Sequence, residues 1–286
     1  MVTTSEISAN GLRFTADLAG EAGAPLVLLL HGFPQTRYTW RHQLPALAAA
    51  GFRAVAPDQR GYSPGARPSG VASYAVDALL ADALAIADAC GAPRFHLVGH
   101  DWGGQLAWLL AARHPERVRT LSVLSRPHPA AFARALESDP AQRERSKHHR
   151  SFQDPNTAAL LIADGARRLR RMLRDHGVPE VDADAYVAPL STYEAIDAAL
   201  NWYRASFRGA SGLSLADTPA VGAPTLFLWG DADLTVGRPA ADATRDFVTG
   251  AYRFVVVSGA GHFITDQSGE AVTKELLAHL ASHASG

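Results

Sequence analysis

The folds open to this chain are limited by one short stretch, in which glycines flank an aspartate: Gly99-His100-Asp101-Trp102-Gly103-Gly104. An apolar run precedes it at residues 95–98, and a segment of helical composition follows it at residues 104–114. A strand that enters a helix through so sharp a turn needs small residues where the two elements touch, and glycine meets that need. Such a turn pushes its central side chain, here that of Asp101, out beyond the end of a sheet.

The residue at the centre of this turn decides the chemistry. A serine in this position serves as the nucleophile of esterases and lipases. Asp101 carries a carboxylate instead, which can open a strained or activated carbon–oxygen or carbon–halogen bond and form an alkyl ester. The sequence therefore excludes the serine esterase and lipase classes.

Strand and helix signals alternate along most of the chain. Short apolar runs predict buried strands at residues 25–30, 53–56, 95–98, 118–124, 224–229 and 252–257. Segments of helical composition lie at residues 73–90, 104–114, 239–248 and 269–282. Continuous apolar strands separated by helices are typical of a parallel sheet that is covered on both faces, so the predicted fold class is α/β.

The alternation stops between about residues 126 and 218, where helical, Arg-rich segments contain Pro and Gly at intervals. We interpret residues 126–218 as a helical cap inserted between two strands of the core. The core would then consist of residues 1–125 and 219–286. The charges of the cap are expected to lie on a solvated helix surface.

Composition and charge indicate which classes of partner and which compartment are expected for this chain. The chain of 286 residues has 27 Lys and Arg against 28 Asp and Glu, so no nucleic-acid surface is expected. Its one cysteine, Cys90, cannot form an internal disulfide, which fits the cytoplasm. No signal peptide is expected from the N-terminus, and no apolar run approaches the roughly 18 residues of a membrane span. We expect a cytoplasmic monomer or homodimer without a membrane partner.

A second motif follows the first strong strand, with the sequence His31-Gly32-Phe33-Pro34. A tight turn at this place would bring the backbone N–H of Phe33 beside that of Trp102. Two such donors form an oxyanion hole. The motif alone is a weak indication of an oxyanion hole, but it is a strong one in combination with the turn at Asp101.

Two later loops are expected to complete the machinery, because α/β sheets place their chemistry at the carboxyl ends of parallel strands. His262 follows the predicted strand at residues 252–257 and is the candidate base. An acid should orient it, and the loop Gly230-Asp231-Ala232-Asp233 offers two carboxylates. We favour Asp233, since Asp231 is nearer the strand and would stabilise the turn.

With these features, the chain resembles the epoxide hydrolases of the α/β-hydrolase fold over nearly its whole length. The matching segments are His31-Gly32-Phe33-Pro34, Trp40-Arg41-His42-Gln43-Leu44-Pro45-Ala46-Leu47, Ala56-Pro57-Asp58-Gln59-Arg60-Gly61-Tyr62, Gly99-His100-Asp101-Trp102-Gly103-Gly104, Asp233 and Gly261-His262. The resemblance implies Asp101 as nucleophile, His262 as water-activating base and Asp233 as its orienting acid, without a metal or a cofactor. One segment, Ser63-Pro64-Gly65, departs from the usual Gly-x-Ser ending of its loop.

Soluble epoxide hydrolases hold the epoxide oxygen with two cap tyrosines. Asn201-Trp202-Tyr203-Arg204 resembles one of the two motifs, which implies Tyr203 as a donor. The other tyrosine stands ahead of a string that reads Phe152-Gln153-Asp154-Pro155 here, and the family's spacing places it at His148. A smaller group of related enzymes carries such a His/Tyr pair. His149, one residue further on, is the alternative to His148, and a third reading is that neither histidine donates.

The resemblance implies that a small epoxide is opened to a vicinal diol through an ester of Asp101. Contacts with the substrate are expected from His31, Phe33, Trp102 and Phe152.

Three alternatives use the same core. A haloalkane dehalogenase usually has Asn where Phe33 stands, and a haloacid dehalogenase usually has Arg where Trp102 stands. A non-catalytic receptor with a hydrolase fold would not need all of Asp101, His262 and Asp233. Assays for halide and for diol would separate these classes. Halide release indicates a dehalogenase, diol formation an epoxide hydrolase, and the absence of both products a receptor.

Overall fold

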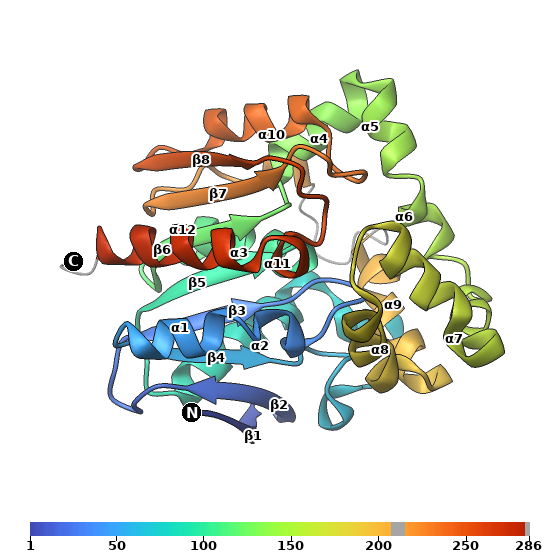
Figure 1. Ribbon diagram of the computed structural model, residues 1–286, viewed down its shortest axis with the longest axis horizontal. Coiled ribbons are helices and arrows are strands. Elements are labelled where there is room, and N and C mark those ends of the chain that lie inside the picture. Colours follow the sequence, from blue (N-terminus) through green and yellow to red (C-terminus); the bar gives the residue numbers. More distant parts are fainter. Residues whose placement is uncertain (207–214, 284–286) are drawn as a thin grey trace.

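The computed structural model describes residues 1–206 and 215–283, and its centre is one eight-stranded sheet (Figure 1). The strand order is β1-β2-β4-β3-β5-β6-β7-β8. The strands are β1 (Val2–Ala9), β2 (Leu12–Ala19), β3 (Leu26–Leu30), β4 (Arg53–Pro57), β5 (Phe95–His100), β6 (Val118–Leu124), β7 (Thr225–Gly230) and β8 (Tyr252–Val257). Strands β3 to β8 pair in parallel, whereas β2 pairs antiparallel with both β1 and β4.

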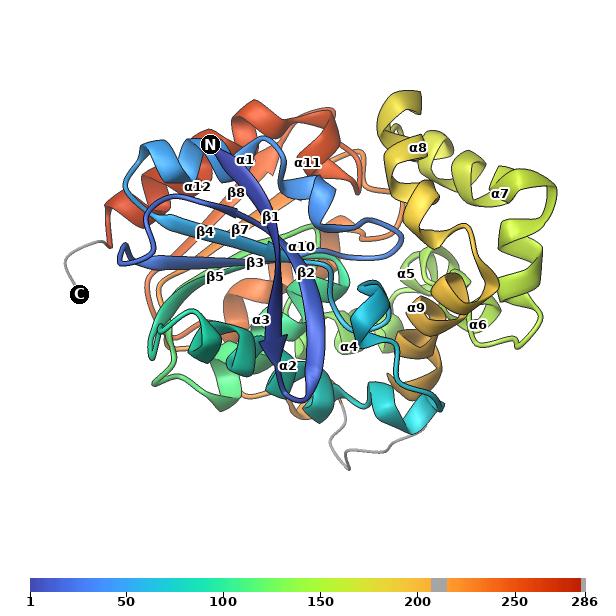
Figure 2. The same ribbon diagram turned by 90° about the horizontal axis from the view of Figure 1, so that it is seen from below.

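Helices cover both faces of this sheet (Figure 2). They are α1 (Gln43–Ala49), α2 (Val76–Ala89), α3 (Trp102–Arg113), α10 (Arg238–Ala243), α11 (Ile264–Gln267) and α12 (Gly269–Ala281). Apolar side chains of α1, α11 and α12 form one buried cluster with the strands, and those of α2, α3 and α10 form another. Short 3-10 helices are η1 (Arg37–Trp40), η2 (Pro64–Ala66), η3 (Val71–Tyr74), η4 (Ala188–Leu190), η5 (Leu215–Asp217) and η6 (Thr244–Phe247). Strands β3 to β7 are buried along almost their whole length, which explains their continuous apolar sequences.

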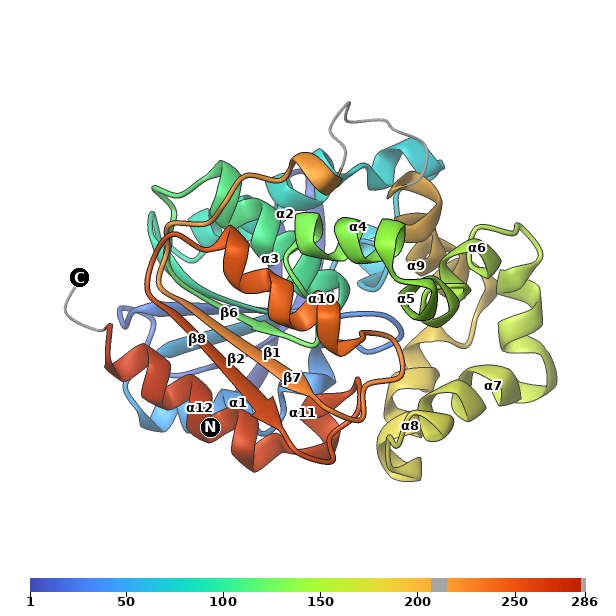
Figure 3. The same cartoon turned by 90° about the horizontal axis from the view of Figure 1, so that it is seen from above.

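The long connection between β6 and β7 is helical. It contains α4 (Pro129–Ser138), α5 (Pro140–Arg145), α6 (His148–Ser151), α7 (Thr157–Asp175), α8 (Glu180–Val187) and α9 (Tyr193–Ser206). Helices α5 to α9 gather at one end of the sheet, whereas α4 packs against α10 (Figure 3). Residues 207–214 of the expected cap lie outside the described residues.

The six predicted strands correspond to β3 to β8. The hairpin of β1 and β2 was not predicted, because most of β1 is exposed and the segment has no continuous apolar run. Helix α1 was missed as well, and the helix predicted at residues 239–248 is shorter, since α10 ends at Ala243 and a 3-10 turn follows. Among the described helices, none combines the length and apolar character needed to cross a membrane.

Candidate active site

Asp101 stands at the sharp turn between β5 and α3. Its φ of 50° lies in the left-handed region, which strains any residue with a side chain. Two glycines make the turn possible. A Cβ on Gly99 would lie 2.3 Å from the carbonyl oxygen of Gly103, and a Cβ on Gly103 would lie 2.1 Å from that of Leu30. The turn therefore presents the Asp101 carboxylate at the carboxyl end of the sheet.

This close approach gives a first prediction. Gly103→Ala should lower the free energy of unfolding by about 1–3 kcal/mol, since the added methyl group meets backbone that must move. Urea denaturation would measure the change. Gly23→Ala is the matched control, because a Cβ there meets nothing within 4 Å, and its effect should stay within about 0.5 kcal/mol. Equal stabilities of the two variants would contradict this account of the turn.

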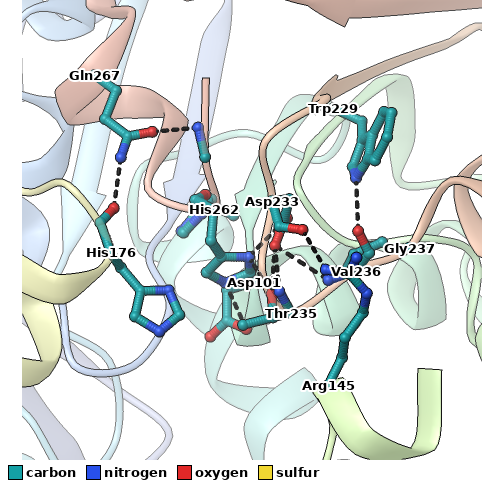
Figure 4. Close-up of polar contacts among 12 residues, drawn as sticks. Asp101, Arg145, His176, Trp229, Asp233, Thr235, Val236, Gly237, His262 and Gln267 are labelled. Atoms are coloured by element: carbon teal, nitrogen blue, oxygen red, sulfur yellow. Dashed lines mark hydrogen bonds and ion pairs between the residues drawn. The ribbon is translucent and has the colours of Figure 1, made fainter. Parts of the chain in front are cut away.

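The structure brings together the side chains of Asp101, His262 and Asp233 from three separate loops (Figure 4). His262 Nε2 lies 3.4 Å from Asp101 Oδ2, and His262 Nδ1 lies 3.0 Å from Asp233 Oδ2. The backbone N–H of Gly259 donates to Asp231 Oδ1 over 2.6 Å, which joins the ends of β7 and β8. Asp233 thus faces His262, whereas Asp231 holds the backbone of the neighbouring loop.

Thr235 is a further member of this cluster, which the sequence did not indicate. Its hydroxyl lies 2.7 Å from Asp233 Oδ1, to which it donates, and 2.6 Å from His262 Nδ1, from which it accepts. The Nδ1–H of His262 is therefore shared between a carboxylate and a hydroxyl. This arrangement fixes the plane of the ring and directs Nε2 towards Asp101.

The charges of this cluster hold one another in place. Burial alone would lower the pKa of His262, but Asp233 and Asp101 outweigh it and raise the pKa to about 10. Burial would raise the pKa of Asp101, yet the hydrogen bond and charge of His262 hold it well below its usual range. At neutral pH the resting site thus contains an ionised Asp101 beside a protonated His262.

One backbone group is hydrogen-bonded to the Asp101 carboxylate, and a second lies at the adjacent helix start. The N–H of Phe33 donates to Asp101 Oδ1 over 3.0 Å. Trp102 is the first residue of α3, where backbone N–H groups have no acceptor within the helix. The Phe33 N–H therefore already holds one oxygen of the carboxylate, and an oxyanion hole formed with the Trp102 N–H stays a prediction.

A cavity of about 430 Å³ opens above Asp101, within the usual size range of a small-molecule site. Its walls come from the strand-end loops and from the helices between β6 and β7. The lining residues are Phe33, Pro34, Asp101, Arg126, Phe132, Glu144, Arg145, Lys147, His148, His149, Phe152, Met172, His176, Tyr203, Leu234, Thr235, Val236, His262 and Phe263. In residues 1–206 and 215–283, no three His, Cys, Asp or Glu side chains are grouped to hold a metal ion.

Tyr203 reaches the cavity from α9, between three aromatic rings. Its ring centre lies 4.9 Å from that of Phe152, 5.0 Å from that of Trp102 and 5.5 Å from that of Phe33. Burial, with the charge of Asp101, raises the pKa of Tyr203 well above its ordinary value. Its hydroxyl therefore stays protonated at any pH at which the protein would be assayed.

His148 and His149 both line the cavity, from α6. The Nδ1–H of His148 donates to the carbonyl oxygen of Arg145 over 3.1 Å, which leaves the lone pair of the neutral ring on Nε2. Burial lowers the pKa of His148 to about 4. Burial and the neighbouring His148 lower the pKa of His149 to about 3. Both rings are accordingly neutral at pH 7.

Two expected substrate contacts are corrected by the structure. His31 does not line the cavity: its ring is fully buried, Nδ1–H donates to the carbonyl oxygen of Gly32 over 3.0 Å, and Nε2 accepts from the N–H of Gln59 over 3.2 Å. The indole of Trp102 packs edge-on against Tyr203 and does not line the cavity either. Phe33 and Phe152 do line it, and their contact with substrate stays a prediction.

Other residues that hold the site have no signal in the sequence, since their partners are backbone groups far along the chain. Gln142 of α5 accepts from the N–H of Gly237 and donates to the carbonyl oxygen of Thr235, each over 2.8 Å. Arg145 donates to the carbonyl oxygen of Asp233 over 2.8 Å. Gln267 accepts from the N–H of Gly261 and donates to the carbonyl oxygen of His176 (Figure 4). Helix α5 of the β6–β7 connection thus fixes the loop of Asp233, whereas Gln267 of α11 joins the loop of His262 to His176, which follows α7.

This fold, with an aspartate at the turn and a histidine–carboxylate pair behind it, is that of an α/β hydrolase. A family model described as alpha/beta hydrolase fold matches residues 25–268. The chain is 34% identical to Epoxide hydrolase A of Mycobacterium tuberculosis over 96% of each chain. It is 35% identical to Epoxide hydrolase 4 of Mus musculus, over 96% of this chain and 78% of the mouse protein.

A solved structure gives the same result. The crystal structure of Epoxide Hydrolase A from Mycobacterium thermoresistibile superposes with a TM-score of 0.84, covers 98% of each chain and is 31% identical. The chain belongs to the epoxide hydrolases of the α/β-hydrolase family. The fold class and the family resemblance inferred from the sequence are confirmed.

Proposed function

We propose that this chain hydrolyses small epoxides to vicinal diols through a covalent ester on Asp101. One observation carries the proposal. A partly buried carboxylate, and not a serine hydroxyl, stands at the turn, with one oxygen on the Phe33 N–H and the other beside His262. A carboxylate held in this way is a nucleophile for carbon, and the cavity above it offers the Tyr203 hydroxyl as a proton donor.

In the first step, Asp101 Oδ2 attacks an epoxide carbon and the bond from that carbon to the epoxide oxygen breaks. Oδ1 stays on the Phe33 N–H, which makes it the carbonyl oxygen of the ester. Tyr203 gives its proton to the leaving oxygen, which remains attached to the substrate as a hydroxyl, and later recovers a proton from solvent. His148 is the proposed second donor. Since its neutral ring bears the lone pair on Nε2, it donates there only after its proton shifts or a second proton arrives.

The ester changes the charge balance of the site. Esterification removes the negative charge of Asp101, which is one of the two charges that raise the pKa of His262. The imidazole can then release its proton to solvent and act as a base towards water. The resulting hydroxide attacks the ester carbonyl, and the N–H groups of Phe33 and Trp102 stabilise the negative charge on Oδ1. Collapse releases the diol, whose leaving oxygen takes the proton from His262. The Asp101 carboxylic acid that remains then gives its proton to His262, which restores the ionised Asp101 beside a protonated His262.

The helices over the site complete this assignment. We propose that residues 126–218 serve as the cap, because α5 to α9 contribute His148, Phe152 and Tyr203 to the cavity wall. The cap also supplies Gln142 and Arg145, which hold the loop of Asp233. Closure over Asp101 would exclude bulk water from the ester until His262 activates one molecule.

A small substrate panel tests this function. We expect diol from an aryl epoxide and an alkyl epoxide, and no halide from a chloroalkane or from fluoroacetate. Asp101→Ala is the control and should abolish diol formation, because no other carboxylate lies at the turn. Halide release without diol would favour a haloalkane or haloacid dehalogenase. Binding without either product would favour a ligand receptor.

A further inference from the structure

The catalytic cavity contains a buried cation that the proposed reaction does not use. Arg126 lies just beyond the carboxyl end of β6, is 7% exposed and lines the cavity. Its Nε donates to Gln105 Oε1 over 3.0 Å, and its guanidinium carbon lies 4.2 Å from the centre of the Phe132 ring. Within the part of the chain that the structure describes, no carboxylate pairs with it and its two Nη groups have no hydrogen-bond acceptor.

A buried charge without a close partner is unfavourable, and proteins seldom keep one without a purpose. Asp101 is the acidic group that acts on Arg126, at longer range, and it opposes the effect of burial, which lowers the Arg126 pKa. Asp101, however, already faces His262. Its charge also disappears when the ester forms, so Arg126 would lose its counter-charge in mid-reaction unless the substrate supplied one.

The other charged groups of the cavity wall do not supply a counter-charge for Arg126. Glu144 is paired with Lys147. Arg145 adds a second guanidinium, directed to the carbonyl oxygen of Asp233. Counted over the described lining residues, positive groups exceed negative ones, and this excess favours an anionic ligand.

The backbone positions Arg126 in an unusual way. Ser125, directly before it, has a φ of 54°, so the end of β6 is strained in the same manner as the end of β5 at Asp101. Non-glycine residues in this region persist where the surroundings hold them, and they cluster at functional sites. Gly104 leaves room for the side chain of Arg126, because a Cβ on Gly104 would lie 3.0 Å from Cβ of Arg126.

We propose that Arg126 binds the anionic group of the substrate, so that this cavity selects small epoxides that carry a carboxylate. A guanidinium offers two parallel N–H groups that match the two oxygens of a carboxylate. The inference rests on the proposed epoxide hydrolysis and adds the substrate class to it.

The experiment compares two substrates that differ in charge and hardly in shape: an epoxyhexanoate with a terminal epoxide, and its primary amide. For the wild-type protein we expect kcat/KM for the acid to exceed that for the amide by about 10- to 100-fold, the usual range for a hydrogen bond to a charged group. The difference should lie mainly in KM, because the contact is made before and during the reaction. Added salt should reduce the ratio of kcat/KM for the acid to that for the amide.

Two variants locate the effect. Arg126→Met removes the charge while keeping an unbranched apolar chain against Phe132, and the acid-to-amide ratio should fall to about one. Arg126→Lys should restore part of the ratio. Lys147→Met is the matched control: Lys147 also lines the cavity, but it is exposed and paired with Glu144, so its loss should leave most of the ratio.

The outcomes separate the two proposals. If neither substrate yields diol, epoxide hydrolysis itself is wrong. If both yield diol at equal kcat/KM in the wild-type protein, Arg126 does not recognise a carboxylate, whatever the variants do. Equal losses for both substrates in Arg126→Met would show that Arg126 serves only as an internal counter-charge for Asp101, and would also overturn the inference.

Discussion

Replacing His262 by Ala is expected to stop the reaction after one ester has formed on Asp101 of each molecule. Asp101 Oδ2 lies 3.4 Å from His262 Nε2 and needs no base to attack, since it is already ionised. The water that attacks the ester, in contrast, loses the base that lies beside Asp101, and loss of a general base slows a step typically about 10²–10⁴-fold. Intact-protein mass spectrometry after incubation with an epoxide should show the mass of one substrate added.

The double variant Asp101→Ala/His262→Ala is the control for this experiment. It lacks the nucleophile, so its mass should stay unchanged under the same conditions. Digestion of the single variant should place the added mass on the peptide that contains Asp101. If the His262→Ala protein remained unmodified and still released diol at the wild-type rate, His262 would not be the base.

The charge balance of the site explains why one histidine can serve both steps. Before the attack, Asp101 and Asp233 raise the pKa of His262 to about 10, so the ring is protonated and stabilises the attacking carboxylate. After the attack Asp233 alone remains of the two charges that raise the His262 pKa, and the pKa falls. Hydrolysis of the ester should therefore become faster as the pH rises through this lower pKa and then level off.

The parts of this protein that the sequence predicted well are those in which neighbouring residues carry the signal. The glycines around Asp101 and the apolar runs of β3 to β8 follow from local geometry and burial. His262 was identified because it follows a strand end, and Asp233 was preferred over Asp231 for its place in the loop. These positions are set by chain order in a parallel sheet.

The rest depends on contacts between distant segments. Thr235 and Gln142 act through hydrogen bonds whose partners only the folded chain brings close. His31 was expected to contact substrate because it begins a motif, but its ring serves the backbone of its own turn and that of Gln59. Arg126 has no motif at all, and its place in the cavity follows from the register of β6 beside β5.

The second large effect is expected at Tyr203. Tyr203→Phe should slow formation of the Asp101 ester by about 10²–10⁴-fold, since it removes a hydroxyl donor and leaves the aromatic packing intact. Hydrolysis of an ester already formed should change much less, because His262 and Asp233 serve that step. Stopped-flow measurement of alkylation, followed through tryptophan fluorescence, separates the two rates.

His148→Ala distinguishes the roles of the two proposed donors. The Nδ1–H of His148 is engaged with Arg145, so His148→Ala should slow alkylation less than Tyr203→Phe does. Since burial lowers the pKa of His148 to about 4, the wild-type alkylation rate should not fall between about pH 5 and pH 8, where an ordinary histidine loses its proton. A fall in that range that disappears in His148→Ala would identify a protonated His148 as the main donor. If it disappeared in His149→Ala instead, the second donor would be His149, and the chain would carry its donor pair one residue further along α6 than the family spacing implies.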